Sequence, residues 1–179
     1  MSLYKEYIKE IKHREHNGLS PLPIENGALL QEIIEHIIDT SSHLYPDSLH
    51  FFIYNTLPGT TGAAYIKANF LREIITQQRI VKDITDDFAF ELLAHMRGGP
   101  SVSVLLDLAL SDNIAVNHKA TEVLKGLVYL YEADMDRIKQ AYASGNKLAE
   151  HLLESYSRAE FFTQLPELDD EIKVVSYVA

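Results

Sequence analysis

Residues 91–110 read ELLAHMRGGPSVSVLLDLAL, two apolar runs on either side of a short RGGP corner at 97–100. Within each run, apolar side chains recur every three or four residues, which is the spacing of one face of an α-helix. Glycine permits the positive φ angles that a tight corner needs. The stretch therefore predicts two helices, over 86–96 and 101–111, that meet at this corner.

A similar pattern occurs 39 residues earlier in the chain. Shifting the sequence by that offset aligns SLHFFIYNTLPG (48–59) with DFAFELLAHMRG (87–98), with apolar residues at matching positions and a glycine at the end of each segment. A period of about 40 residues is typical of HEAT and armadillo repeats, in which helical hairpins stack and bury one face on the next. We therefore expect an all-α fold of stacked, HEAT-like helical hairpins that form an α-α superhelix.

Helical periodicity extends over most of the chain. The first predicted helix runs from Leu3 to a stop signal at Asn17 and Gly18. The remaining predicted helices, besides the two at the RGGP corner, cover 28–39, 47–57, 61–78, 114–131, 134–144 and 147–164. Thr85, Asp134 and Asn146 stand at expected N-cap positions. Two prolines make GLSPLPIENG (18–27) an extended connector.

The end of the sequence departs from this helical pattern. In IKVVSYVA (172–179) β-branched residues alternate with other side chains, which predicts a strand. A single strand cannot pair its own backbone groups. We therefore expect a helical domain over 1–165, followed over 166–179 by a linker and the first strand of a further domain that is absent from this chain.

Composition excludes several classes of site. The 179 residues are 46% hydrophobic, enough for one domain with a buried core. No cysteine is present, so disulfides, thiolate metal sites, cysteine nucleophiles and cysteine-held iron-sulfur clusters are excluded. The sequence shows neither a signal peptide nor an apolar run long enough to span a membrane, and we expect a cytoplasmic location. The net charge of -10 argues against a nucleic-acid partner.

The RGGP corner lacks the features of a nucleotide-binding loop. A Walker-type loop needs a lysine followed by Ser or Thr after a buried strand, and the sequence predicts neither here. Backbone amides at the start of the following helix, with Arg97 beside them, can instead contact an anion or a protein partner. Arg97, Gly98 and Gly99 are therefore a candidate interaction surface.

His13 and His16 lie three residues apart on one face of the first predicted helix. This spacing occurs in metal sites, but the sequence fixes no third ligand, and we interpret both as part of a solvated polar face and of the candidate interaction surface. Two acidic stretches, at 85–88 and 167–171, suit a helix start and a linker better than a catalytic pair of carboxylates.

Several motifs together resemble one known family. They are EYIKEIKHREHNGLSPLPI, PGTTGAAYIKANFL, AFELLAHMRGGPSVSVLLDLAL, ASGNKLAEHLLESYSRAEFFTQLPEL and IKVVSYVA, in this order. The chain resembles, over essentially its whole length, the amino-terminal end of bacterial aconitase B. The resemblance implies a HEAT-like domain placed ahead of a swivelling domain and of three domains that hold a [4Fe-4S] cluster.

The resemblance also implies a function for the larger protein. Aconitases are lyases of the citric acid cycle that interconvert citrate and isocitrate through cis-aconitate, and the B type also acts on the 2-methyl analogues. For this chain it implies no catalytic, cofactor-binding or metal-binding residue. The implied roles are shaping substrate access, dimerisation and protein-protein contacts, with the remaining aconitase domains as partners in cis. Binding of mRNA, known for the family's cluster-free form, fits poorly with the charge of -10.

Two alternatives from other classes remain open at this point. The chain can be a free-standing helical-repeat module that binds proteins, although the unfinished strand argues against this interpretation. It can also be an RNA- or metal-binding regulatory domain that acts through its first helix. The residues of that hypothesis are Lys5, Lys9, Lys12, His13, Arg14 and His16.

Overall fold

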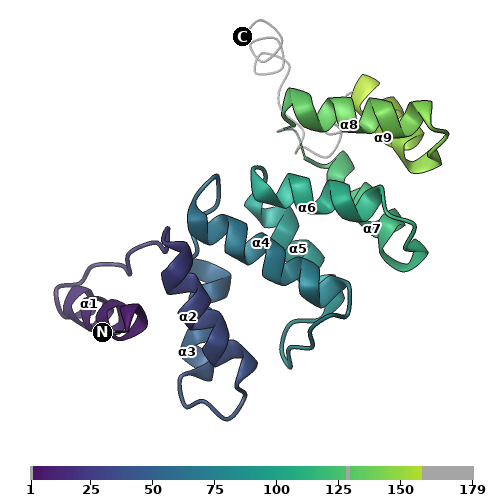
Figure 1. Ribbon diagram of the computed structural model, residues 1–179. Coiled ribbons are helices and arrows are strands. Elements are labelled where there is room, and N and C mark those ends of the chain that lie inside the picture. Colours follow the sequence, from purple (N-terminus) through teal and green to yellow (C-terminus); the bar gives the residue numbers. More distant parts are fainter. Residues whose placement is uncertain (1, 128–129, 159–179) are drawn as a thin grey trace, which may run out of the picture.

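The computed structural model describes residues 2–127 and 130–158 (Figure 1). Within these ranges the regular elements are all helical, apart from two isolated β-bridges. The helices are α1 (Leu3–His16), α2 (Gly27–Ile38), α3 (Tyr45–His50), the π-helical η1 (Phe51–Asn55), α4 (Gly62–Ile75), α5 (Asp86–Met96), α6 (Pro100–Ala109), α7 (Ile114–Lys125), α8 (Glu132–Ala143) and α9 (Lys147–Ser157). The expected all-α fold is confirmed.

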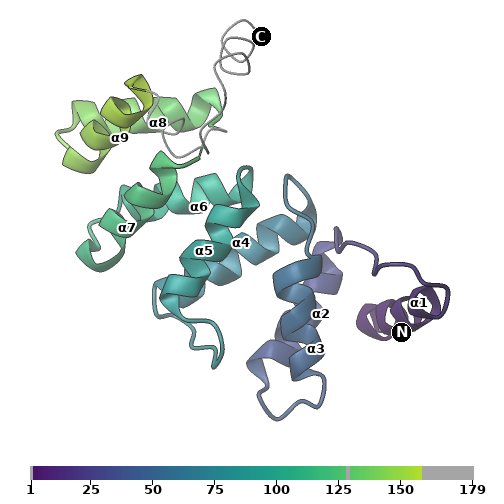
Figure 2. The same cartoon turned by 180° about the vertical axis from the view of Figure 1, so that it is seen from behind.

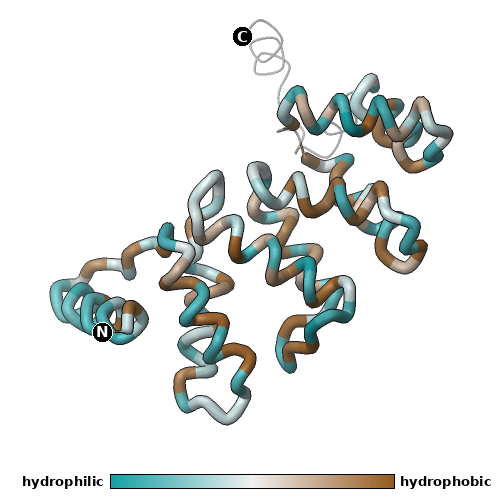
Figure 3. The backbone as a smooth tube through the Cα atoms, viewed as in Figure 1, coloured by the Kyte–Doolittle hydropathy of each residue, from teal (hydrophilic) through white to brown (hydrophobic). Residues whose placement is uncertain are grey.

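Within residues 2–127 and 130–158, the helices after α1 pair into four antiparallel hairpins, α2 with α3 and η1, α4 with α5, α6 with α7, and α8 with α9. The hairpins stack into a curved array, which Figure 2 shows from behind. Along the array α2 contacts α4, α4 contacts α6, α5 contacts α7, and α7 contacts α9. Hydropathy alternates along most of the helices (Figure 3), and their apolar faces form one continuous core. The stacked-hairpin prediction is therefore correct.

The stack has two different edges (Figure 1). The turns inside the hairpins lie along what we call the tip edge, at the lower and right side of the view. The connections between hairpins, after η1, α5 and α7, lie along the opposite side, which we call the corner edge. Each tip carries one exposed large apolar side chain, and these are Ile38, Ile80, Ile114 and Tyr142.

Helix α1 packs back onto the first hairpin. The rings of Tyr4 and Tyr7 meet the Phe51 ring edge to face, and the buried Tyr4 hydroxyl lies 2.8 Å from Ser48 Oγ. The carboxylate of Glu32 on α2 accepts hydrogen bonds from Ser2 Oγ at 2.6 Å and from the backbone amides of residues 3 and 4. A side chain of α2 therefore caps the first turn of α1.

The connector from α1 to α2 is extended, as predicted. Ile24 forms a parallel bridge to Thr56, in which Ile24 N donates to Asn55 O at 2.7 Å and Leu57 N donates to Ile24 O at 3.0 Å. Asn55 also donates from Nδ2 to the Tyr7 hydroxyl at 3.2 Å. The end of η1 thus holds both α1 and the connector in place.

A buried lysine stabilises the π-helical end of this hairpin. The side chain of Lys67 on α4 is 4% exposed, and its Nζ donates to Phe52 O at 2.7 Å and to Ile53 O at 3.0 Å. The ammonium also lies 5.1 Å from the centroid of the Phe52 ring. Burial lowers the pKa of Lys67 to about 8. Carbonyl groups at an irregular helix end need such donors when they are buried.

Three predicted helix boundaries before α8 need correction. The helix expected over 61–78 ends at Ile75, and Gln77 has a φ of 59° that no helix continues through. The helix expected over 114–131 ends at Lys125, with Gly126 as its C-cap. The helix expected over 47–57 starts earlier, at Tyr45, and becomes a π-helix from Phe51.

The predicted N-caps are right at two of three positions. The side chains of Thr85 and Asn146 accept hydrogen bonds from the first-turn amides of α5 and α9. Asp134 is not an N-cap, because α8 starts after Tyr131. Instead its carboxylate accepts a hydrogen bond from Tyr131 N at 3.2 Å, as the third residue of a capping box does. The helix predicted over 147–164 ends at Ser157, with Arg158 as its C-cap. The linker, the strand predicted over 172–179 and the boundary at 165 lie outside the described residues.

Candidate functional site

The connections at the corner edge touch one another. A Cβ atom on Gly99 would lie 2.6 Å from Gly59 O, so the backbones of the two glycine corners are in direct contact. Gly99 has a φ of 59° and Gly59 a φ of 102°, both in the left-handed region that favours glycine. The two corners that the sequence repeat aligns are therefore neighbours in space.

An open pocket of about 440 Å³ lies where these corners meet the start of α8. We call it the corner pocket. Its lining residues come from three successive connections of the stack and are Pro58, Gly59, Thr60, Met96, Arg97, Gly98, Gly99, Leu130 and Tyr131. Met96 is buried, whereas the Tyr131 side chain is 59% exposed. The pocket is therefore mainly apolar, with one cationic side chain in its wall.

That cation is Arg97, the C-cap of α5. Its backbone has a φ of 58°, and its amide donates to Ala94 O at 3.2 Å. The side chain is exposed and makes no ion pair or side-chain hydrogen bond within the described part of the chain. Next to it, Gly98 O accepts a hydrogen bond from Ser101 Oγ at 3.0 Å. The corner thus presents a positive charge that the described fold leaves unused.

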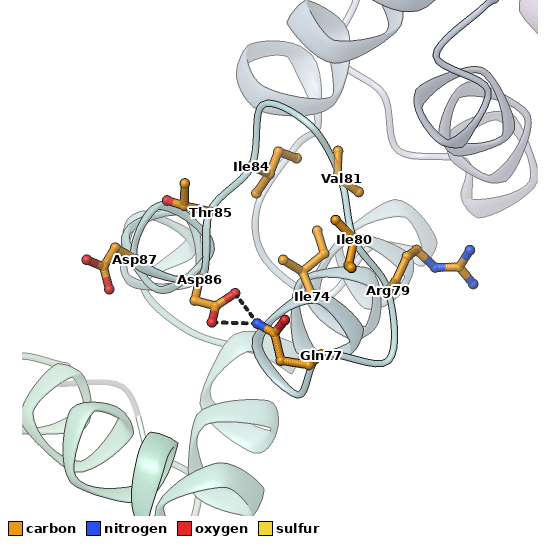
Figure 4. A pocket seen from close by; sticks show the side chains of 9 residues that line it. All are labelled: Ile74, Gln77, Arg79, Ile80, Val81, Ile84, Thr85, Asp86 and Asp87. Atoms are coloured by element: carbon orange, nitrogen blue, oxygen red, sulfur yellow. Dashed lines mark hydrogen bonds between the residues drawn. The ribbon is translucent and has the colours of Figure 1, made fainter.

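A second open pocket, also about 440 Å³, lies at the tip of the α4–α5 hairpin (Figure 4). Ile74, Val81 and Ile84 form its buried floor, and Ile80 is 86% exposed above them. Gln77 donates to both carboxylate oxygens of Asp86, at 2.7 and 2.6 Å.

The charged residues around this tip pocket already have partners. Arg79 points away from the pocket centre, and its Nε donates to Glu73 at 2.7 Å. Asp87 also points away and forms an ion pair with Lys119 on α7. Asp86 and Asp87 lie in the first turn of α5, which is the role that the sequence predicts for them. Among the described residues that line it, the tip pocket therefore offers no free acid or base in a position to react.

His13 and His16 lie on the exposed last turn of α1. His13 Nε2 is 3.4 Å from Asn17 Nδ2. Over residues 2–127 and 130–158, no three His, Asp or Glu side chains are grouped so that they can hold a metal ion. The histidines belong to the helix that covers the first hairpin, whereas the Arg97 corner joins the second hairpin to the third. The fold does not bring the two parts of the candidate surface together.

One residue of the corner pocket, Tyr131, and one buried residue outside both pockets, Lys67, escaped the sequence analysis. Tyr131 was placed inside a predicted helix, because GLVYLY continues the apolar periodicity of the segment before it. Lys67 lies on the apolar face of α4 with Ala63, Ala64 and Leu71. Helical spacing in the sequence could therefore have predicted that this lysine is buried. Its partners, two carbonyl oxygens on another helix, have no signal in the local sequence.

Comparison with known families identifies this fold. The family described as "Aconitate B N-terminal domain" matches residues 6–162. This chain belongs to that family. The resemblance in the sequence motifs is thereby confirmed over most of the chain.

Curated relatives of the chain are named aconitate hydratase B. It is 27% identical to the aconitate hydratase B of Pseudomonas aeruginosa and 25% identical to that of Escherichia coli, each over 98% of this chain. It is 27% identical to the aconitate hydratase B of Helicobacter pylori over 94% of this chain. These matches cover 20%, 20% and 19% of the relatives, so the chain spans about a fifth of their length.

The donor atoms of this aconitase B domain do not fit an iron-sulfur cluster. Cysteine thiolates hold [4Fe-4S] clusters, and the chain contains no cysteine. Ligands for a cluster therefore have to come from residues outside this chain. Among the described helices, none is long and apolar enough to cross a membrane.

Proposed function

We propose that this chain is a non-catalytic domain of a cytoplasmic aconitate hydratase B, a lyase of the citric acid cycle. Its roles are to contact the remaining domains in cis, to support a homodimer or other protein-protein contacts, and to shape the path of substrate. The observation that carries this proposal is the family match over residues 6–162, in a chain that spans a fifth of its relatives and has no cysteine.

The form of the fold supports a contact role. A stack of helical hairpins offers long edges and faces to large partners. Both pockets are open hollows at those edges, and the acidic groups of the tip pocket are paired with neighbouring side chains. Such a surface suits macromolecular contacts better than bond-breaking chemistry.

Arg97 supports the role in substrate access. The substrates of aconitases are tricarboxylates, and a chain with a net charge of -10 repels them over most of its surface. Arg97, which has no charged partner among the described residues, supplies a local positive charge at the corner edge that attracts either such an anion or an acidic segment of a neighbouring domain.

The first test asks which native protein contains this chain. Antibody raised against residues 1–179 is used on an extract of the source cells, and the antigen is then followed through purification together with citrate-isocitrate activity. We expect an antigen several times larger than 20.3 kDa that copurifies with the activity. A single antigen near 20.3 kDa without activity would contradict the proposal and support a free-standing repeat module.

The second test uses the native protein with Arg97→Ala. We expect kcat/KM for citrate to fall about twofold to tenfold at low ionic strength, and the loss to shrink when salt screens the charge. Lys82→Ala is the matched control, because it removes one exposed positive charge from the tip edge. Equal effects of the two variants would contradict a role for the corner in substrate access.

A further inference from the structure

One face of α1 carries a row of basic side chains. Lys5, Lys9 and Lys12 are exposed, and the exposed His16 continues the row in the last turn of the helix. An α-helix turns about 100° and rises about 1.5 Å per residue, so the four side chains fall within an arc of about 60° and over a length of about 17 Å. We call this row the basic stripe.

The other side of α1 is covered by the first hairpin. Tyr4, Tyr7 and Ile11 are buried there, and the two tyrosine rings pack edge to face on Phe51. Figure 3 shows α1 as a mainly hydrophilic helix at one end of the array. The basic stripe therefore faces away from the hairpins.

No acid of the described chain pairs with the basic stripe. Within residues 2–127 and 130–158, none of the ion pairs involves a side chain of α1. By contrast, ion pairs are formed by Lys119, Lys125, Lys139 and Lys147. Like charges three or four residues apart on one helix repel each other and destabilise it. An anionic partner laid on the stripe would remove this repulsion.

The acids beside the basic stripe favour a protein as that partner. Glu6 and Glu10 border the stripe on one side and Glu15 borders it on the other, at helical spacing. A nucleic-acid strand offers only negative charge, so these acids and the net charge of -10 both repel it. A protein segment can place carboxylates on the stripe and basic side chains against the bordering acids.

We propose that the basic stripe is the docking surface for an acidic α-helix of a partner protein. A helix that lies along α1 matches the stripe when its Asp or Glu residues have the same spacing of three and four. A second copy of this chain fits less well, because Glu6 and Glu10 on its α1 span one turn, whereas the stripe spans three. The proposal adds a partner class to the contact role and does not depend on which larger protein contains the chain.

Fluorescence anisotropy with labelled peptides tests this docking in the full 179-residue chain. The probe is an alanine-based helical peptide of about 20 residues, with glutamates along one face at the spacing of the stripe. The control peptide has the same composition, with its glutamates spread around the helix. We expect the probe to bind at least about fivefold more tightly than the control peptide at low ionic strength, and its binding to weaken with added salt.

Lysine variants locate the binding surface. Lys5→Ala, Lys9→Ala and Lys12→Ala together should weaken binding of the probe by about tenfold or more, because three charge pairs are lost. Alanine is the best helix former, so α1 should stay folded in this variant. The matched control removes the same charge from three exposed lysines outside α1, Lys82→Ala, Lys139→Ala and Lys147→Ala. That control should weaken binding less than about twofold.

A charge exchange separates the pattern of the stripe from its net charge. Glu6→Lys combined with Lys9→Glu keeps the net charge of α1 but interrupts the row. We expect this variant to bind the probe about threefold or more weakly than the native chain does. Unchanged binding would mean that only net charge matters and would overturn the proposal.

The remaining outcomes separate the proposal from its alternatives. Equal affinities for the two peptides, or equal losses in the two triple-lysine variants, would overturn it. Tighter binding of poly(U) RNA than of the probe would assign the stripe to nucleic acid, and self-association that the stripe variant abolishes would assign it to a second copy. Either result would also overturn the proposal. Because the test uses the purified chain and synthetic peptides, its failure leaves the antigen-size result on the native protein unaffected.

Discussion

At the scale of single residues, two glycines set how closely neighbouring hairpins approach at the corner edge. Gly99 and Gly59 are in backbone contact, and each has a positive φ. Gly145, at the tip of the last hairpin, also has a positive φ of 87°, but a Cβ there would meet nothing within 4 Å. A comparison of Gly99 with Gly145 therefore separates the cost of backbone strain from the cost of steric crowding.

We expect Gly99→Ala to lower the free energy of unfolding more than Gly145→Ala does. Strain from a positive φ costs each variant about 1–2 kcal/mol, and only Gly99→Ala also pushes two backbones apart, which adds about 1–3 kcal/mol. Urea unfolding of the two variants measures the difference. Equal losses would mean that the corners separate freely and that their contact contributes no stability.

Lys67 is the most strongly perturbed cation among the described residues. Burial disfavours its charged form, so the pKa of about 8 in the folded chain lies below the ordinary value of 10.5 for an unfolded lysine. Between these two pH values the unfolded chain binds more protons than the folded chain. The free energy of unfolding therefore increases as the pH is raised from 8 towards 10.5.

We expect a rise of about 2 kcal/mol between pH 8 and pH 10. The folded pKa values of Tyr4, Tyr7 and Tyr45 are raised, that of Tyr45 to about 12, and their stabilising contributions are lost only above pH 10. Urea titrations at several pH values test the prediction, and Lys67→Met should remove the rise. A rise of the same size in Lys67→Met would assign the effect to another group.

At the scale of elements, α1 depends on a carboxylate supplied by another helix. The hydrogen bond from the Ser2 hydroxyl, followed by the one from the Tyr4 amide, lowers the pKa of Glu32. The contribution of Glu32 to stability is present above the ordinary pKa of about 4.5 and is lost as pH falls through the lowered value. Acid should therefore loosen α1 from α2.

We expect Glu32→Ala to raise hydrogen exchange in α1 several-fold, because the variant loses the acceptor for the Ser2 hydroxyl and for the first-turn amides of α1. The stacked hairpins should keep their protection. Glu35→Ala is the control, since Glu35 is an exposed acid on the same helix. Increased exchange throughout the molecule, or the same increase in the control, would contradict a local capping role.

The elements also show how much of this fold local sequence can predict. Local sequence correctly predicts features that depend only on neighbouring residues. These are the corner glycines at 98 and 99 and the N-caps Thr85 and Asn146. The end of α7 at Lys125 was missed, because the apolar periodicity continues past Gly126. The contacts of Lys67 and Glu32 join distant helices, so the sequence gives no local sign of them. The same limit applies to the corner pocket, whose walls come from three separate connections.

At the scale of the whole molecule, successive hairpins are joined by ion pairs as well as by their buried apolar faces. The Asp107 carboxylate on α6 lies 3.8 Å from Arg72 on α4 and 2.5 Å from Arg137 on α8. These side chains are about 40% exposed, so each pair contributes little to stability in water. The stack is held mainly by its buried faces, and among the described helices the α8–α9 hairpin packs on a neighbouring hairpin on one side only.

We expect this one-sided contact to make the final hairpin the weakest part of the described stack. Leu152→Ala on α9 and Leu105→Ala on α6 both remove a fully buried side chain, and each should cost about 2–5 kcal/mol. Leu152→Ala should raise hydrogen exchange in α8 and α9 alone, whereas Leu105→Ala should raise it throughout the stack. Uniform exchange in both variants would show that the domain unfolds as a single unit.

The neighbour-only pattern of contacts also bears on how the protein is made. Each hairpin closes between helices adjacent in sequence and then packs on the hairpin synthesised just before it. Chains with mostly local contacts fold quickly, because little loop entropy is lost before each contact forms. The domain can therefore assemble hairpin by hairpin as it leaves the ribosome, while any later part of the polypeptide is still being translated.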